Sequence, residues 1–177
     1  MRIFWLILVC IASTGVSWPV QSSDIVVGNL IIEKPWSRAT PRGAKVGAGY
    51  LTIINTGADV DRLISVTSDV SKRVEIHATS LSGGIMRMRR LSKGIVIDSK
   101  SFVRLQPGGK HFMFVGLKQP LKKGASFQAS LRFEKAGSVQ VKFLISDIGG
   151  KSPYADDDTI SGGSNSGTRR GSTQKLN

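Results

Sequence analysis

The chain has 177 residues, a formal net charge of +13 and a single cysteine, Cys10. This length suits one domain with a substantial hydrophobic core. No block of consecutive lysines and arginines resembles a nucleic-acid-binding arm, so the charge predicts acidic partners or an anionic membrane surface, and no nucleic acid. If the N-terminal segment is removed, the mature chain has no cysteine, which excludes a disulfide, a thiolate nucleophile and a thiolate metal ligand.

Residues 1–22 have the pattern of a secretory signal peptide. Arg2 is followed by an apolar run from Ile3 to Ala12 and then by small residues, which is the order that export signals use. The run is short for a membrane span, and an uncleaved anchor is the alternative. Cys10 lies too early in the chain, and in the wrong context, for a lipid-attachment signal. We therefore expect an exported, periplasmic protein.

Residues 23–149 contain a succession of predicted strands that form one domain. The segments are rich in Val, Ile and Phe, are separated by turn-forming residues, and lack helical periodicity. They are 25–32, 48–55, 62–68, 73–79, 84–91, 94–98, 101–105, 111–117, 126–134 and 138–145. Many short strands at regular spacing predict an all-β sandwich or barrel. Residues 150–177 are rich in Gly, Ser and Asp and predict a flexible, disordered tail.

The stretch "HFMF" combines two kinds of side chain on one predicted strand. Side chains along a strand alternate between its two faces. Phe112 and Phe114 therefore share one face, and His111 and Met113 share the other. If the phenylalanines enter the core, His111 and Met113 project together on the opposite side.

The other histidine follows the same rule. His77 shares a strand face with Arg73 and Glu75, and Met86 shares one with Met88. Both histidines, and every methionine except Met1, thus lie between positions 77 and 113. A single methionine more often fills a gap in a core, and a single histidine more often has a structural role. Their clustering on shared faces favours a metal site instead.

The ligand types indicate which metal such a site would bind. Thioether sulfur is soft and favours Cu(I), and imidazole accepts copper in either oxidation state. Zinc prefers cysteine, histidine or carboxylate, and a blue-copper electron carrier needs a cysteine thiolate. A set of two histidines and two methionines therefore indicates Cu(I), held for transfer by ligand exchange.

Long stretches of the chain closely resemble the PCu(A)C family of periplasmic copper chaperones. They are "WSRATPRGAKVGAGYLTIINTGADVDRL", "VEIHATSLSGGIMRMRRL", "LQPGGKHFMFVGLKQPLKKG" and "FEKAGSVQVKF". The resemblance implies a cupredoxin-like Greek-key β-sandwich and delivery of Cu(I) toward the binuclear copper site of cytochrome c oxidase. By position in the family's His-x₁₀-Met…His-x-Met motif, the implied ligands are His77, Met88, His111 and Met113. Met86 would be a substitute ligand or part of the site's apolar rim.

Four basic residues flank the candidate ligands: Arg87, Arg89, Arg90 and Lys110. They form either an ordinary solvated surface or a basic collar that docks an acidic partner. The expected partner is a copper-accepting protein, such as a cytochrome c oxidase subunit or another assembly chaperone. We further expect a monomer and transient contact with an anionic membrane surface. The chain offers no nucleophile–base motif, which indicates that it is not an enzyme. The alternative is a secreted, basic β-sandwich for surface binding or adhesion that binds no metal.

Overall fold

The computed structural model describes residues 24–154. The predicted signal peptide and residues 155–177 of the predicted tail lie outside this range. Within residues 24–154 every regular element is a strand, so the described part includes no helix able to cross a membrane. The strands are β1 (Ile25–Val27), β2 (Leu30–Arg38), β3 (Val46–Asn55), β4 (Asp61–Ser68), β5 (Ser71–Ser82), β6 (Ile85–Arg90), β7 (Ile95–Ile97), β8 (Ser101–Leu105), β9 (Lys110–Leu117), β10 (Ser126–Phe133) and β11 (Ser138–Ser146).

The predicted strands are confirmed except at the start of the domain. The single strand expected over 25–32 is two strands joined by a tight turn, in which Gly28 has φ 55° and Val27 pairs with Leu30. A glycine adopts this left-handed conformation without a steric penalty. Strand β2 then continues through Pro35, because an irregularity between Glu33 and Trp36 interrupts the ladder there. Proline is tolerated in a sheet at such a bulge.

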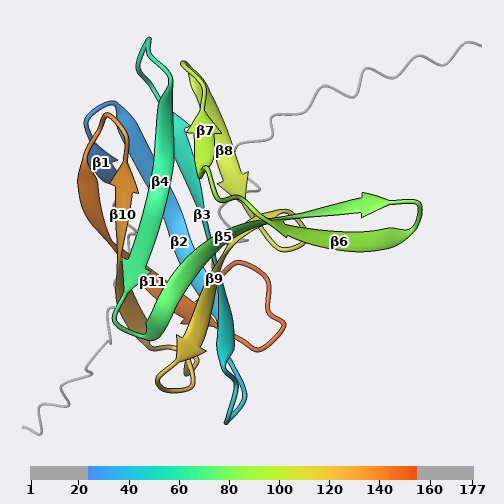
Figure 1. Ribbon diagram of the computed structural model, residues 1–177. Coiled ribbons are helices and arrows are strands. Elements are labelled where there is room, and N and C mark those ends of the chain that lie inside the picture. Colours follow the sequence, from blue (N-terminus) through green and yellow to red (C-terminus); the bar gives the residue numbers. More distant parts are fainter. Residues whose placement is uncertain (1–23, 155–177) are drawn as a thin grey trace, which may run out of the picture.

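The strands form one mixed sheet that folds over on itself. The order is β6-β5-β9-β8-β3-β2-β11-β10-β4-β7, and β1 pairs with β2, while β3 also pairs with β9. Strands β9 and β10 are far apart in this order, yet Phe114 of β9 contacts Phe127 of β10, with ring centroids 5.0 Å apart. The two halves of the sheet therefore face each other across a common core, as Figure 1 shows. The predicted all-β sandwich is confirmed.

Phenylalanines from the two walls form the centre of the core. Phe112 and Phe114 of β9 have no exposed surface. They make edge contacts with Phe143 of β11, which in turn stacks on Phe127 at 5.3 Å. Phe114 fits because β3 has Gly49 beside it: a Cβ at Gly49 would lie 2.6 Å from the Phe114 ring. This packing fixes which face of β9 points inward.

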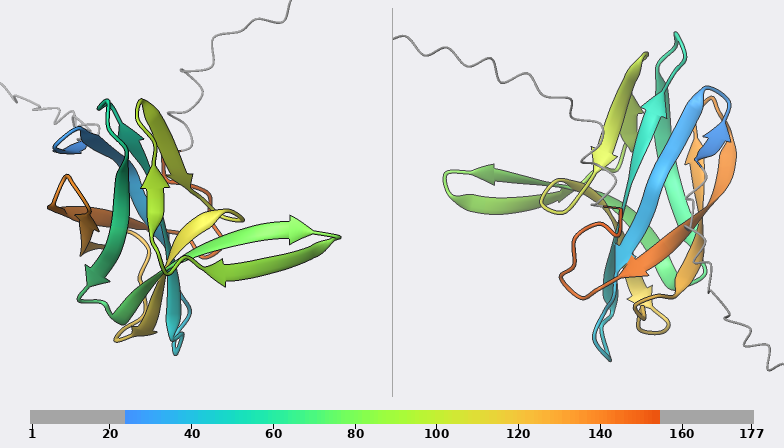
Figure 2. Two further views of the ribbon diagram at one scale, coloured as in Figure 1. Left: turned by 45° about the horizontal axis from the view of Figure 1, so that its top comes forward. Right: turned by 180° about the vertical axis from the view of Figure 1, so that it is seen from behind.

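The β5–β6 hairpin extends beyond the sandwich. Among the described strands, β6 pairs only with β5, and all six of its residues are exposed. Both views in Figure 2 show the hairpin projecting from the body. Beyond β11, Gly150 is tied to β2, because its carbonyl accepts a hydrogen bond of 3.1 Å from Arg38 Nε.

We expect Phe114→Ala to lower the free energy of unfolding by about 3–5 kcal/mol, because it removes a fully buried ring from a packed cluster. Chemical denaturation measures this change. Phe102→Ala is the matched control, since Phe102 is largely exposed and its loss should change stability by no more than about 0.5 kcal/mol. Equal losses in the two variants would contradict this account of the core.

Candidate metal centre

The β5–β9 register brings the two histidines together. His77 is paired directly with His111, and Glu75 is paired with Met113. Residues directly opposite each other in an antiparallel pair point to the same face, so these four side chains share one face. The intervening pair, Ile76 and Phe112, points into the core. The predicted separation of "HFMF" into two core residues and two outward residues is confirmed.

The two imidazole rings lie side by side. Their centroids are 5.9 Å apart and their planes are inclined by 36°. Although His111 points away from the core, it is only 8% exposed. His77 is also largely covered, with 13% of its side chain exposed. The pair is therefore shielded from most of the surrounding water, which the sequence did not predict.

The backbone fixes the tautomer of His111. Its Nδ1 lies 3.1 Å from the carbonyl oxygen of Gly109. A carbonyl only accepts, so Nδ1 carries the proton and donates. In the neutral ring the lone pair is then on Nε2. No protein atom among the described residues forms a hydrogen bond with Nε2, so this nitrogen remains available to a ligand.

Glu75 fixes the opposite tautomer of His77. The Nε2 atom of His77 lies 3.0 Å from Glu75 Oε2. When the imidazole is neutral, Nε2–H donates to this carboxylate and Nδ1 carries the lone pair. Nδ1 is buried and has no hydrogen-bond partner among residues 24–154. An unpartnered buried polar atom is rare in a folded protein, and metal-binding histidines commonly hold one nitrogen in this way while the other binds the metal.

Two arginines keep Glu75 ionised. Arg73 Nε donates to Glu75 Oε1 at 2.9 Å, and Arg90 Nη1 lies 3.7 Å from the same oxygen. The hydrogen bond from Arg73, followed by that from His77, lowers the pKa of Glu75 from 4.5 to about 2. The sequence predicts Glu75 on the face of His77, but it does not reveal the role of this carboxylate. The alternation of Arg73, Glu75 and His77 was the available signal.

The methionines differ in how close they are to this pair. Met113 follows His111 on the same face of β9 and is partly buried. On β6 the direct partner of His77 is Arg90, while Met88 is paired with Thr79. Met88 is therefore a diagonal neighbour of His77 on the shared face. Met86, paired with Leu81, lies one further step out along the hairpin.

The basic residues do not form one collar. The register puts Arg90 on the face of the histidines, where it pairs with Glu75. Arg87 and Arg89 point to the opposite face of the hairpin. Lys110 joins them, because it is paired with Ala78, which is itself paired with Arg89. The expected collar is thus divided between two faces.

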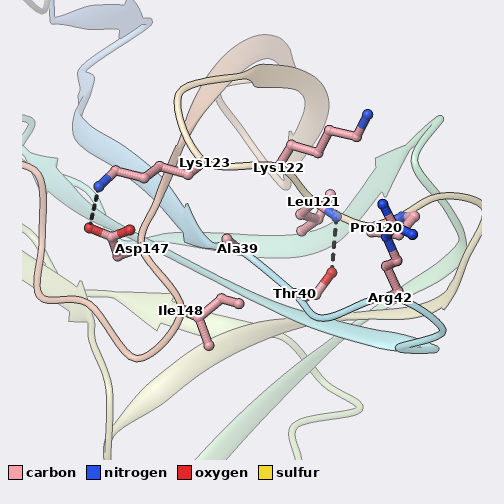
Figure 3. Close-up of a pocket in the computed structure, with 9 residues that line it drawn as sticks. All are labelled: Ala39, Thr40, Arg42, Pro120, Leu121, Lys122, Lys123, Asp147 and Ile148. Atoms are coloured by element: carbon pink, nitrogen blue, oxygen red, sulfur yellow. Dashed lines mark hydrogen bonds and ion pairs between the residues drawn. The ribbon is translucent and has the colours of Figure 1, made fainter.

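A separate hollow of about 420 Å³ lies between residues 39–42, 120–123 and 147–148. Figure 3 shows Lys123 directed at Asp147, where its Nζ donates to Asp147 Oδ2 at 2.6 Å, and Leu121 N donating to Thr40 Oγ1 at 2.9 Å. Its lining includes neither histidine nor methionine. The candidate ligands are therefore not in this hollow. Across residues 24–154 no cluster of three or more His, Cys, Asp or Glu is arranged to hold a metal.

Comparison with known proteins identifies the family. A family model described as "Putative lipoprotein LpqE-like" matches residues 30–145. The chain belongs to the LpqE-like family. A relative from Leifsonia xyli, named "Putative lipoprotein Lxx21020", is 29% identical over 119 residues, which cover 67% of this chain and 70% of the relative. Protein RP573 of Rickettsia prowazekii is 30% identical over 119 residues, covering 64% of this chain and 66% of that protein.

Solved structures relate this LpqE-like protein to copper-binding domains. The copper-bound PCuAC domain from PmoF2 has a TM-score of 0.62 and 29% identity, covering 71% of this chain and 98% of that domain. The apo PCuAC domain from PmoF1 has a TM-score of 0.60 and 28% identity, with 71% and 99% covered. The expected cupredoxin-like Greek-key sandwich is confirmed. The resemblance to the PCu(A)C family holds in structure, while the matching family model has another name.

We expect Glu75→Ala to release the Nε2–H tautomer of neutral His77, because the carboxylate that accepts this proton is lost. Glu75→Gln should retain the tautomer, since the amide oxygen can still accept. The ¹⁵N chemical shifts of the imidazole nitrogens in the apo protein, measured at alkaline pH, distinguish the two tautomers. His111 is the internal control and should keep its Nδ1–H form in both variants. A wild-type His77 protonated at Nδ1 would contradict the assignment.

The lowered pKa of Glu75 also predicts a pH dependence of stability. Its folded-state pKa of about 2 lies below the ordinary 4.5, so the ionised form stabilises the fold. This contribution is complete above about pH 4.5 and is lost as the pH falls toward 2. Denaturation of the apo protein between pH 5 and pH 2 should therefore show a steeper loss of stability in the wild type than in Glu75→Gln. Identical slopes would exclude this role for Glu75.

Proposed function

We propose that this protein is a copper chaperone that binds Cu(I) through His77, Met88, His111 and Met113. One observation carries the proposal: two opposed imidazoles each have one nitrogen bound to a protein acceptor and one nitrogen without a hydrogen-bond partner among residues 24–154. The methionines on the same face supply soft thioether donors. Copper in the related PmoF2 domain supports the assignment of the metal.

The tautomers indicate which atoms would bind the metal. His77 would use Nδ1 and His111 would use Nε2, because their other nitrogens donate to Glu75 and Gly109. With two neutral imidazoles and two thioethers, the ligands add no negative charge. Such a set favours Cu(I) over divalent ions. Met86 lies outside the set, since the register places it one step beyond Met88.

The exposure of the ligands suits transfer more than permanent storage. The histidines are largely covered, whereas Met88 is more than half exposed on the hairpin. An incoming ligand could therefore replace Met88 first while the histidines still hold the ion. The resemblance to PCu(A)C chaperones supports a copper-accepting protein as the recipient, with the binuclear copper site of cytochrome c oxidase as its destination. We propose no enzymatic activity.

The proposed location is the periplasm. The pattern of residues 1–22 supports export, as do the lipoprotein names of the family and of the Leifsonia relative.

A competition titration with a Cu(I) chelator under reducing conditions tests the proposed site. His77→Ala and Met113→Ala should each weaken Cu(I) affinity about tenfold or more, equivalent to at least about 1.4 kcal/mol. Met88→Leu should weaken it more than the matched Met86→Leu. If His77→Ala and Met113→Ala retained wild-type affinity, the assignment would be wrong. Salt-sensitive binding to anionic surfaces without copper uptake would favour the adhesion module instead.

A further inference from the structure

The β5–β6 hairpin has an exposed apolar face. Leu81, Met86 and Met88 point to the same side as His77 and are 68%, 63% and 56% exposed. Ile85, beside the turn and on the opposite side of the hairpin, is 59% exposed. Large side chains gathered on one exposed element, next to a candidate site, are typical of an interaction surface. Methionine is well suited to such surfaces because its flexible side chain adapts to different partners.

The opposite face of the hairpin is cationic. It presents Arg87 and Arg89, with Lys110 beside them on β9. No acidic residue occurs between positions 76 and 97, so these charges have no counter-charge on the hairpin itself. Glu75, at its base, is already bound by Arg73, His77 and Arg90. The two-stranded hairpin therefore has a net positive charge and one apolar face.

We propose that this hairpin docks an acidic protein that exchanges copper with the chaperone. The partner would place an apolar patch against Leu81, Met86 and Met88, and a ring of Asp or Glu around that patch would meet Arg90. The field of Arg87 and Arg89 would act across the two-stranded ribbon and speed the encounter. This inference rests on the proposed function and adds the partner's surface chemistry to it.

The geometry favours this occupant over two others. A second copy would bring the same positive ribbon against its own, and like charges oppose such contact. An anionic membrane would satisfy the charge. However, the apolar face also carries the candidate ligands, so a membrane seated there would cover the site without supplying a ligand to receive copper. A protein with its own soft ligands can cover the face and receive the ion.

The hairpin also gains order from such a partner. A two-stranded ribbon has only marginal stability in water, and within residues 24–154 no strand pairs with the outer side of β6. Contact with the apolar face would bury side chains that the sandwich leaves exposed. The arginines on the back face would remain in solvent, which keeps the complex reversible.

The test uses the ¹⁵N-labelled apo protein and a pair of synthetic peptides. Each peptide has a Met-x-x-Met centre with two leucines, flanked by aspartates in one peptide and by asparagines in the other. We expect NMR shift changes centred on residues 77–90 and about fivefold tighter binding of the acidic peptide at low salt, a difference that high salt removes. Equal affinity for both peptides, or shifts centred elsewhere, would overturn the proposal.

Charge-reversed variants supply the matched control. Arg87→Glu with Arg89→Glu should weaken binding of the acidic peptide about tenfold. The control pair is Arg132→Glu with Lys142→Glu, at exposed residues of β10 and β11. This pair should leave binding of the acidic peptide unchanged. Equal weakening by both pairs would show that only total charge matters and would refute the docking surface. Leu81→Ser should also weaken binding, and unchanged binding there would refute the apolar contact.

The other occupants are tested with the same protein. If phosphatidylglycerol vesicles shift the hairpin signals and prevent binding of the acidic peptide, the occupant of this face is a membrane and the proposed protein partner is wrong. If sedimentation detects dimers and the NMR signals of the same residues shift, the occupant is a second copy of this chain and the proposed partner is wrong. The NMR shift changes caused by the peptides are measured without copper. Failure of this test is therefore distinct from failure of the Cu(I) titration, which tests the proposed function alone.

Discussion

The register between β5 and β9 is the constraint on which the candidate site depends. In a strand pair, a slip of one residue moves every side chain to the other face. Here Ile76 and Phe112 are held in the core, so His77 and His111 must meet on the outer face. Burial of two phenylalanines on β9 thereby sets the spacing of two imidazoles that make no contribution to the core.

The same register joins the site to its polar support. Glu75 reaches His77 because residues two apart on a strand share a face, and Arg90 reaches Glu75 because β6 pairs with β5. The carboxylate holds the ring of His77 while the two arginines hold the carboxylate. The candidate ligands thus lie at the junction of a rigid sandwich and a projecting hairpin.

Sequence alternation was sufficient to predict the strands and the face of each candidate ligand. It could not predict the hydrogen bonds of His77 and His111, because those depend on side-chain conformation and on the carbonyl of Gly109. Alternation also places Arg90 on a different strand face from Arg87 and Arg89. The contact between Arg90 and Glu75 depends on the pairing of β6 with β5, which alternation does not give. The turn at Gly28 was missed because the apolar run from Ile25 to Ile32 continues across it. The assignment of the four residues as ligands stays a prediction.

The direct pairing of His77 with His111 has a consequence for the mechanics of the chain. Strands β6, β7 and β8 lie in the loop between these two residues. An ion bound by both rings would close that loop, as a disulfide does in other exported domains. In a chain whose single cysteine lies in the predicted signal peptide, the cargo would serve as a removable cross-link. Delivery of the ion would then remove this constraint and lower the stability that it adds to the folded chain.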